Sequence, residues 1–442
     1  MEVNMITKES IKRQIEENGI KMIRLQFTDM MGKLKSVEVP VSQIDMILNN
    51  DVIFDGSSIE GFVRIMEADM YLYPDLATFK IIKDDIARLI CDIYKTDRTP
   101  FEGDPRGNLK RVMKEMDELG YGSFNLGLEP EFYLLKLDEF GNPTADTNDF
   151  DSYFDLSAIE QAGDCLREIV YRLEEIGFTI EASHHEVGPG QYEINFKYAN
   201  VLEACDNIQT YKHVVKDVAS KYGLYASFMP KPFSEKAGSG MHTNCSLADK
   251  EGNNVFYDEN APLQLSQTCL YWIGGITKHA RALCAITNPI VNSYKRLTPG
   301  YEAPCYIAWS TENRSTFIRI PASRKQATRT EIRSVDCSCN PYLAMAAVLA
   351  CGLDGIKNKI EPMQPSYINI FELTRKERQE LNIKNLPNSL KDALNSLEED
   401  QLVINAIGKH TYEKFMEAKL KEWADYRHQI TDWELKHYIY TI

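Results

Sequence analysis

The sequence predicts an α+β fold in two parts, a small N-terminal α/β domain of residues 1–104 and a larger domain of residues 105–442. The chain is longer than one ordinary domain. Glycine, proline and aspartate gather at residues 100–107, as they do at boundaries. Beyond them, strand and helix patterns alternate irregularly and consecutive strands are joined by tight loops. That pattern favours a largely antiparallel sheet with helices outside it.

The first part begins with a short amphipathic helix. Thr7 is a suitable N-cap for this helix, and Gly19 follows it as a stop signal. Two strands are expected next, at residues 22–27 and 34–39, joined by a turn that contains Gly32.

The sequence pattern of the second part, residues 105–442, predicts several longer helices and strands. The longest apolar run, residues 343–353, is too short to span a bilayer and predicts a core helix. The expected helices are residues 108–119, 157–177, 201–221, 262–287 and 343–353, and the expected strands lie at residues 128–135, 179–198 and 225–247.

The C-terminus carries an amphipathic helix pattern. Thr431 and Glu434 form a capping box, and four apolar residues follow at helical spacing: Leu435, Tyr438, Ile439 and Ile442. Such a stripe either folds back on its own core or docks on a neighbouring molecule, and the pattern alone leaves both readings open.

Bulk composition excludes several classes of protein. The net charge of −15 argues against a nucleic-acid partner, which would require clustered Lys and Arg. The first 18 residues lack the apolar core of a signal peptide, and no apolar run is long enough for a membrane span. The ten cysteines are dispersed, which predicts reduced, mostly buried thiols in a cytoplasmic protein.

Polar residues recur with the two-residue period of a strand face. Residues two apart in a strand share a face, and an interior sheet face would otherwise be apolar. Taken alone, the pair Glu129 and Glu131 is more often a solvated strand face, and a lone histidine such as His242 is more often a core residue. The repetition favours a shared site instead. The sets are Glu129 and Glu131; Glu193 and Asn195; His242, Asn244 and Ser246; Arg329, Glu331 and Arg333.

The carboxylates in these sets require a cation. Glu186 and Glu193 bracket a Gly-Pro-Gly turn that can bring them together. Neighbouring carboxylates repel each other unless a metal neutralises them. Oxygen ligands with a single histidine suit Mg²⁺ or Mn²⁺ better than zinc. His184 and His185, which precede Glu186, either orient a ligand or simply pack.

Arginines accompany the carboxylates. Planar guanidinium groups near a metal grip phosphate or carboxylate oxygens in pairs. The sequence has neither a Walker A motif nor a G-x-G-x-x-G motif, so a nucleotide would be held by metal and arginine. This combination predicts phosphoryl transfer. The arginines are Arg296, Arg314, Arg319, Arg329 and Arg333.

These residues stand in motifs that resemble one family over essentially the whole chain. In order they are Asp55-Gly56-Ser57-Ser58, Gly127-Leu128-Glu129-Pro130-Glu131-Phe132, His184-His185-Glu186-Val187, Gly238-Ser239-Gly240-Met241-His242, the run from Lys295 to Pro304, Asn313-Arg314-Ser315, Ile318-Arg319-Ile320-Pro321, Glu331-Ile332-Arg333 and Asn340-Pro341-Tyr342-Leu343. The chain resembles type I glutamine synthetase.

The resemblance implies two metal sites and an ATP site, with two or three Mg²⁺ or Mn²⁺ ions. It assigns Glu131, Glu186 and Glu193 to one metal, and Glu129, His242 and Glu331 to the other. The residues that it implies for ATP and its phosphates are Glu181, Ser246, Arg314, Arg319 and Arg329.

The resemblance also implies how glutamate and ammonium bind. Arg296 would hold the α-carboxylate of glutamate, Arg333 its side-chain carboxylate, and Gly238 would contact it through the backbone. Asp55 would bind ammonium and help to remove its proton. Glu302 would close the site from a flap, since γ-glutamyl phosphate must be kept from water.

Architecture and partners follow from the same resemblance. An N-terminal β-grasp domain would precede a catalytic α/β domain with a curved, largely antiparallel sheet. Two stacked hexamers would form a homododecamer, with active sites between adjacent subunits, and the C-terminal tail would insert into the opposing ring. Small nitrogen-regulatory proteins are possible partners.

Four positions classify the chain or depart from the family pattern. Phe371 stands where one branch has an adenylylated tyrosine, so that control would be absent. Arg64 resembles the arginine of the branch that glutamine inhibits directly. Ala237 replaces a common asparagine, which leaves one substrate contact in doubt, and Cys337 replaces a common proline.

Three alternatives to a glutamate–ammonia ligase make different demands on the sequence. A related γ-glutamyl-amine ligase would use a polyamine, which Asp55 and Glu302 oppose. A non-catalytic member acting as an interaction protein would lack metal ligands, and all six are present. A dinuclear-metal hydrolase would leave the arginines and the flap unexplained.

Overall fold

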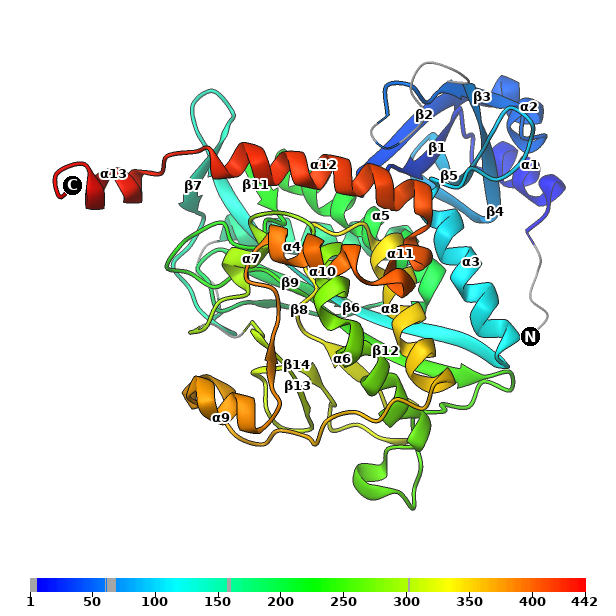
Figure 1. The fold of residues 1–442 in the computed structure, drawn as a ribbon. Helices are drawn as coiled ribbons and strands as arrows, with labels where there is room; N and C mark the ends of the chain where they lie inside the picture. Colours follow the sequence, from blue (N-terminus) through cyan, green and yellow to red (C-terminus); the bar gives the residue numbers. More distant parts are fainter. Residues whose placement is uncertain (1–5, 60, 62–68, 157–159, 301–302) are drawn as a thin grey trace.

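The computed structural model describes residues 6–59, 61, 69–156, 160–300 and 303–442 (Figure 1). Its strands form two sheets, one of five strands and one of eleven. Helices pack on both sheets, which confirms the predicted α+β class. Among the described residues, no helix is both long and apolar enough to cross a membrane.

The five-stranded sheet belongs to the N-terminal part. Its strands are β1 (Met22–Thr28), β2 (Leu34–Pro40), β3 (Val52–Asp55), β4 (Asp69–Lys83) and β5 (Ile86–Tyr94), in the order β2-β1-β5-β4-β3. The central pair β1 and β5 is parallel, and the other pairs are antiparallel. This is the expected β-grasp arrangement.

One face of this sheet is apolar and packs against helix α1 (Lys8–Glu17), with the short α2 (Ile44–Leu48) beside it. Ile11 and Ile15 on α1 are buried against Ile23, Leu25 and Leu89. The Thr7 hydroxyl accepts a hydrogen bond from the Ser10 backbone N–H, so the predicted helix start is confirmed.

The expected boundary segment runs into a helix earlier than predicted. Helix α3 spans Pro105–Glu118, because the Asp104 side chain caps its first turn and Pro105 takes the first helical position. The predicted start at residue 108 was therefore three residues late. The proposed division between residues 104 and 105 coincides with this N-cap.

The eleven-stranded sheet is built around one long strand, β6 (Tyr121–Leu137). All the recorded pairs are antiparallel except β13 with β14. The main order is β16-β13-β14-β15-β12-β6-β9-β8, and β7, β10 and β11 pair with β6. The other strands are β7 (Pro143–Thr147), β8 (Ile180–His185), β9 (Gln191–Phe196), β10 (Ala199–Asn200), β11 (Leu224–Ser227), β12 (Met241–Asp249), β13 (Tyr306–Ser310), β14 (Thr316–Arg319), β15 (Thr330–Ile332) and β16 (Lys384–Asn385).

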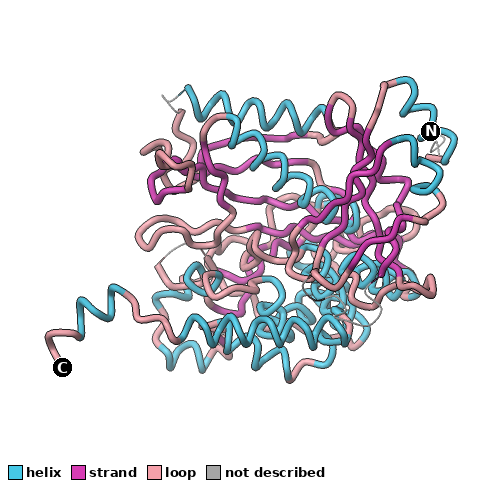
Figure 2. The backbone as a smooth tube through the Cα atoms, turned by 90° about the horizontal axis from the view of Figure 1, so that it is seen from above, coloured by secondary structure: helices cyan, strands magenta, loops and turns pink. Residues whose placement is uncertain are grey.

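Helices lie outside these strands (Figure 2). The helices are α4 (Glu160–Glu175), α5 (Val201–Lys221), α6 (Gln267–Thr287), α7 (Ser293–Arg296), α8 (Pro341–Lys357), α9 (Arg375–Glu380), α10 (Leu390–Glu398), α11 (Gln401–Ile407), α12 (Lys409–Arg427) and α13 (Asp432–Tyr438). The helix predicted at residues 201–221 is confirmed in both bounds. The helix predicted from residue 262 begins later, because the Ser266 side chain caps α6.

The predicted core helix is α8, which is buried around most of its surface. It crosses α6 at close range, because a Cβ at Gly275 would stand only 2.1 Å from the Cys351 carbonyl oxygen. All ten cysteines are free and buried, which confirms the thiol state that the sequence predicted.

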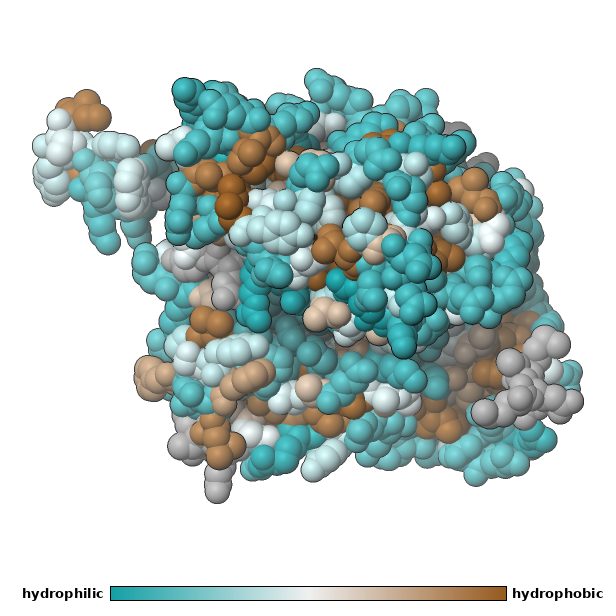
Figure 3. All heavy atoms as spheres, turned by 90° about the horizontal axis from the view of Figure 1, so that it is seen from below, coloured by the Kyte–Doolittle hydropathy of each residue, from teal (hydrophilic) through white to brown (hydrophobic). Residues whose placement is uncertain are grey.

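The C-terminal helix α13 stands away from the body of the chain (Figures 1 and 2). Its capping box between Thr431 and Glu434 forms as predicted. The apolar residues that follow it are exposed, Ile439 at 60% and Ile442 at 101%. Figure 3 shows the same projecting segment with hydrophobic atoms near its tip. Of the two readings left open, the tail does not fold back on its own core.

Candidate active site

The strands that carry the predicted ligands are neighbours in the sheet. Residue pairing places His242 of β12 opposite Glu129 of β6, and Asn244 of β12 opposite Glu331 of β15. Glu131 of β6 stands opposite Glu193 of β9. Directly paired residues of neighbouring strands point to the same face. The polar strand faces that the sequence predicts one strand at a time therefore form one continuous surface.

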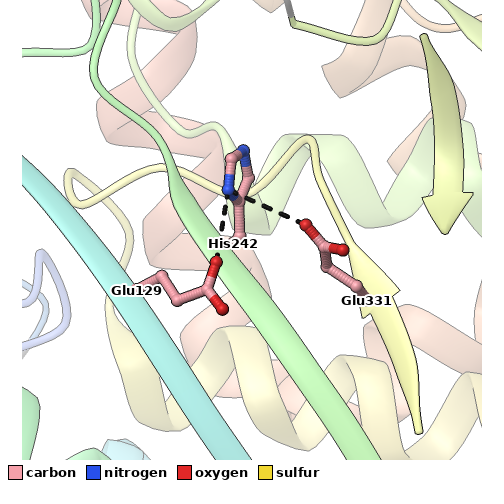
Figure 4. Close-up of side chains that lie close together, drawn as sticks. All are labelled: Glu129, His242 and Glu331. Carbon is pink, nitrogen blue, oxygen red and sulfur yellow. Dashed lines mark ion pairs between the residues drawn. The ribbon is translucent and has the colours of Figure 1, made fainter. Parts of the chain in front are cut away.

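Glu129, His242 and Glu331 form a compact triad (Figure 4). His242 Nδ1 lies 3.5 Å from an oxygen of Glu129 and 3.8 Å from an oxygen of Glu331. Burial and the nearby Arg333 lower the pKa of His242 to about 3. The imidazole is therefore neutral at pH 7, so one ring nitrogen keeps a lone pair that can ligate a cation.

A second cluster surrounds the Gly-Pro-Gly turn. His184 Nε2 lies 2.9 Å from Glu186 and 3.9 Å from Glu193. The turn is closed by hydrogen bonds between Gln191 and Gly188 and between Glu186 and Gln191, both 2.8 Å. The turn thus brings the two glutamates together as the sequence suggested. Of the two histidines whose role the sequence left open, His184 joins the cluster.

Glu131 adjoins this second cluster. Its carboxylate accepts hydrogen bonds from the Gly240 N–H at 2.9 Å and from the Gln191 side chain at 3.1 Å. Burial, followed by the charge of Glu186, raises the pKa of Glu131 to about 7. Burial and the neighbouring carboxylates raise the pKa of Glu193 to about 9. These carboxyl groups repel one another in the absence of a cation.

Both clusters fit divalent metal ions. The ligand atoms of each cluster all lie within 4.8 Å of one another. Ligands of one ion at about 2.1 Å stand roughly 3–4 Å apart, so small movements would close either cluster on Mg²⁺ or Mn²⁺. A bound cation would also supply the positive charge that the buried carboxylates lack.

Two arginines hold the inner carboxylate of the triad. Glu331 is fully buried, and one of its oxygens accepts a hydrogen bond from Arg333 at 2.6 Å. Its other oxygen accepts one from Arg319 Nε. Arg329 donates to the Asn244 side chain at 3.0 Å, and Arg314 is exposed between β13 and β14. Positive charge is thus concentrated at one side of the triad.

Two cavities meet at the metal clusters. One, of about 260 Å³, is lined by Glu129 together with the predicted nucleotide residues Glu181, Ser246 and Arg329. The other, of about 510 Å³, contains His242 in its wall. Because Glu129 and His242 belong to one triad, that triad lies where the cavities adjoin. The second cavity is also lined by Glu131, Glu186, Gly238, Arg296 and Arg333.

Two glycines, Gly238 and Gly240, leave space beside Arg296 in the wall of the larger cavity. Arg296 is buried and donates hydrogen bonds to the backbone carbonyls of Ser334 at 2.7 Å and Arg333 at 3.0 Å. A Cβ at Gly240 would stand 2.3 Å from its guanidinium group, and a Cβ at Gly238 would stand 2.6 Å from a backbone oxygen. The glycines therefore let a cationic group reach the cavity wall.

Comparison with known protein families decides the identity. Residues 19–96 match the model of the glutamine synthetase β-grasp domain, and residues 102–438 match that of the glutamine synthetase catalytic domain. The chain belongs to the glutamine synthetase family.

Individual relatives agree along the full length. The chain is 55% identical over 438 residues to the glutamine synthetases of Staphylococcus aureus strains Mu50 and N315, and the alignment covers 98% of each chain. It is 54% identical to that of a Staphylococcus epidermidis strain over the same length. Among solved structures, the "GmaS/ADP complex-Conformation 1" and "Apo GmaS without ligand" superpose with TM-scores of 0.89 and 0.88. Both are 33% identical and cover 98% of this chain and 100% of their own.

Three of the predicted residues, Asp55, Glu302 and Arg64, are not among the described residues that form the metal clusters or line the two cavities. Asp55 ends β3, the edge strand of the other sheet, where it is exposed and accepts a hydrogen bond from the Ser57 N–H. The structure does not bring it into either metal cluster. Glu302 and Arg64 lie outside the described residues.

Sequence reasoning missed two residues that support the second cluster. Gln191 bonds both Glu131 and the Gly238 carbonyl, and its position two before Glu193 on β9 is a signal that the strand period offered. Asp149 lies in a loop after β7, where no periodicity marks it. It is fully buried and accepts hydrogen bonds from the Gly190 N–H at 2.5 Å and from His185 Nε2 at 3.1 Å.

Asp149 fixes the position of the Glu186 backbone through His185. His185 Nδ1 lies 2.6 Å from the Glu186 carbonyl oxygen, and both partners of the ring are acceptors, so both nitrogens carry protons. Burial opposes that charge, but the hydrogen bonds that His185 donates to Asp149 and to the Glu186 carbonyl, together with the Asp149 charge, outweigh it and raise the pKa of His185. Burial likewise opposes the Asp149 charge, while His185 and Tyr192 lower the pKa of Asp149.

We expect Asp149→Asn to weaken metal binding at the second cluster. The amide cannot accept all the hydrogen bonds that converge on the carboxylate, so the turn that carries Glu186 loosens. The Mg²⁺ concentration for half-maximal activity should rise by about 10–100-fold. Asp146→Asn, an exposed residue of the preceding strand, is the matched control. An unchanged Mg²⁺ requirement in the Asp149 variant would refute this positioning role.

Proposed function

We propose that the chain ligates ammonia to the side-chain carboxylate of L-glutamate, using ATP and passing through γ-glutamyl phosphate. The observation that carries this proposal is the triad at the junction of the two cavities, with one cavity lined by the predicted nucleotide residues and the other by the predicted glutamate residues. A nucleotide and an amino acid held there would meet at the buried carboxylates and arginines.

The larger cavity suits glutamate. Arg296 and Arg333 line it and are complementary to the two carboxylates of the substrate, while Gly238 allows close backbone approach. Ala237 also lines it, where it presents only a methyl group. Glutamate would therefore lie with its side-chain carboxylate toward the triad.

The smaller cavity suits ATP. Arg329 lines it and Arg319 donates to Glu331 of the triad, and with Arg314 they would take the phosphates and the transferred group. Two or three divalent cations would neutralise the phosphate oxygens and favour phosphoryl transfer. The glutamate carboxylate displaces ADP, and ammonia then displaces phosphate from γ-glutamyl phosphate.

The nucleophile requires a carboxylate that accepts a proton from ammonium. We assign this role to Asp55 and the closing of the site to Glu302. Asp55 is exposed at the edge of the N-terminal sheet and apart from the metal clusters of its own chain, which supports a site completed by a neighbouring subunit. Hydrogen bonds from Ser57 lower the pKa of Asp55, which keeps it ionised at neutral pH.

The test is phosphate release from ATP by the purified protein. Release should require glutamate, ammonium and Mg²⁺ together, and glutamine should form in equal amount. Asp55→Asn should lose ammonium-dependent synthesis while retaining ATP binding. Phosphate release that persists without glutamate would instead indicate a hydrolase.

A second candidate is ligation of an organic amine, because the solved relatives named GmaS belong to a γ-glutamylmethylamide synthetase. Rates with ammonium, methylamine and putrescine at equal concentrations of free base separate the two. The higher identity to named glutamine synthetases favours ammonium. A higher kcat/KM with methylamine or putrescine would favour the second candidate.

We infer that the chain assembles as a homododecamer of two stacked hexamers in the cytoplasm. The exposed apolar face of α13 supports docking of the tail on another subunit, since none of its side chains belongs to a hydrophobic core of the described residues. Deleting residues 431–442 should convert the dodecamer to single rings on analytical ultracentrifugation. A dodecamer of unchanged stability without the tail would contradict this role.

Regulation is proposed to follow the directly inhibited branch. Phe371 packs against Tyr306 and has no hydroxyl to adenylylate. Glutamine should therefore inhibit the purified protein without any modification, and Arg64→Ala should reduce that inhibition. Small nitrogen-regulatory proteins remain candidates as binding partners of this form.

A further inference from the structure

Basic residues line up across three neighbouring strands of the N-terminal sheet. Arg88 of β5 pairs with Arg24 of β1 on one side and with Lys80 of β4 on the other. Like charges opposite each other in a sheet are destabilising. This row lies on the face away from the α1 packing, in a protein whose net charge is −15.

Arg88 is the central residue of this row, and it is buried. Only 6% of its surface is exposed, and its Nε and Nη1 atoms have no hydrogen-bond partner among the described residues. The carboxylate that acts most on Arg88 is Asp206, but both of its oxygens already accept hydrogen bonds from Arg106. A buried guanidinium with unmet donors carries a large desolvation penalty.

Arg88 lines a cavity of about 230 Å³ between the sheet and helices α4 and α5. Five permanent cations line it: Arg24, Lys83, Arg88, Arg172 and Lys221. Three carboxylates pair with members of this set: Glu38 with Arg24 at 2.6 Å, Glu175 with Arg172 at 2.5 Å and Asp217 with Lys221 at 2.7 Å. Five cations against three carboxylates leave two positive charges without an ionic partner in the described chain, those of Arg88 and Lys83.

We propose that this cavity binds a small dianion that bridges the N-terminal domain and the catalytic domain. The ligand class is a compact phosphate or short dicarboxylate, whose two charges match the two unpaired cations. Arg88 would supply the buried donors, and Arg172 and Lys83 would close the site from its mouth. A volume of about 230 Å³ is below that of sites for drug-sized ligands, which suits a compact ligand.

This site is separate from the metal clusters, because none of its lining residues belongs to them. Its two walls come from different domains. β1, β4 and β5 form one wall, and α4 and α5 form the other. A bound dianion would therefore stabilise the packing of the β-grasp domain on the catalytic domain.

The test measures thermal stability of the full-length protein with added inorganic phosphate or succinate, against chloride at equal ionic strength. A ligand at a hundred times its Kd should raise the Tm by about 2 °C or more, and chloride should not. A response to phosphate alone assigns a phosphate ligand, a response to succinate alone assigns a dicarboxylate, and a response to both assigns any compact dianion. Calorimetric titration then gives the Kd.

Variants locate the effect. Arg88→Gln should weaken dianion binding by about tenfold or more, since it removes a buried charge-assisted contact. Lys83→Gln, at an exposed residue, should weaken it by about threefold and keeps the test valid if the Arg88 variant does not fold. Arg167→Gln is the matched control on α4, because this exposed arginine pairs with Asp164 away from the cavity.

The active site also takes phosphate, so Arg319→Gln is included to remove that contribution. The response should persist in this variant. The proposal is overturned if the wild-type protein responds to neither dianion, as it would if a neighbouring subunit's carboxylate filled the cavity. It is also overturned if Arg88→Gln and Lys83→Gln respond like the wild-type protein.

Discussion

Glu331→Gln is expected to reduce glutamine synthesis by about 10³-fold, the largest effect of any single substitution in the catalytic sheet. Glu331 is fully buried and serves three neighbours: Arg319, Arg333 and His242. The amide keeps the shape but removes the charge, which leaves two guanidinium groups facing each other and the triad short of one anionic ligand. The measurement is kcat for ammonium-dependent phosphate release at saturating ATP and glutamate.

The same substitution should lower stability. Breaking a buried ion pair by removing one partner costs about 3–5 kcal/mol, because the remaining charge is left uncompensated. Denaturant unfolding at fixed Mg²⁺ would show this loss. Glu312→Gln is the matched control, since Glu312 is exposed in the loop between β13 and β14. A Glu331 variant with near wild-type kcat would remove the triad from the catalytic site.

Removal of divalent cations is the second large effect, and it depends on pH. In the folded chain without metal, the pKa of Glu131 is raised to about 7 and that of Glu193 to about 9, mainly by burial. Between an ordinary glutamate pKa of about 4.3 and these values, the folded chain binds more protons than the unfolded chain. The stability of the metal-free protein should therefore fall as the pH rises from about 5 to 9.

Metal binding should remove that trend. A cation binds the ionised carboxylates, so it displaces their protons and its affinity increases with pH. The Tm in EDTA should decline from pH 6 to pH 9, whereas the Tm in Mg²⁺ or Mn²⁺ should change little. Titration calorimetry in two buffers of different ionisation enthalpy should detect proton release at pH 7.5. A flat Tm in EDTA, or no proton release, would contradict the buried carboxylate site.

Strand periodicity accounts for most of what could be predicted about the site. The two-residue period placed Glu129 and Glu131 on one face and His242 and Asn244 on another, and pairing of β6 with β12 joined these faces. The glycine-rich turn between Glu186 and Glu193 could also be predicted from adjacent residues, and it brings the two carboxylates together. These predictions succeeded because strand faces and tight turns depend on neighbouring residues.

Helix ends were predicted less well, for a local reason. Asp104 and Ser266 cap α3 and α6, and a cap overrides the apolar pattern in setting the first residue of a helix. The C-terminal tail differs again. Its capping box and apolar stripe were visible in the sequence, but only the folded chain shows that the stripe meets none of its own core.

By itself, the sequence determined the chemistry of this protein: the kinds of ligand, the faces that carry them, the arginines beside them and, through its motifs, the family. Tertiary structure decided which of these groups meet. It put His184 rather than His185 in the second cluster, set Asp149 behind the turn and left Arg88 without an ionic partner among the described residues, in a cavity between domains. Those contacts join segments far apart in the chain. They depend on strand order and register across the sheet, which no local pattern specifies.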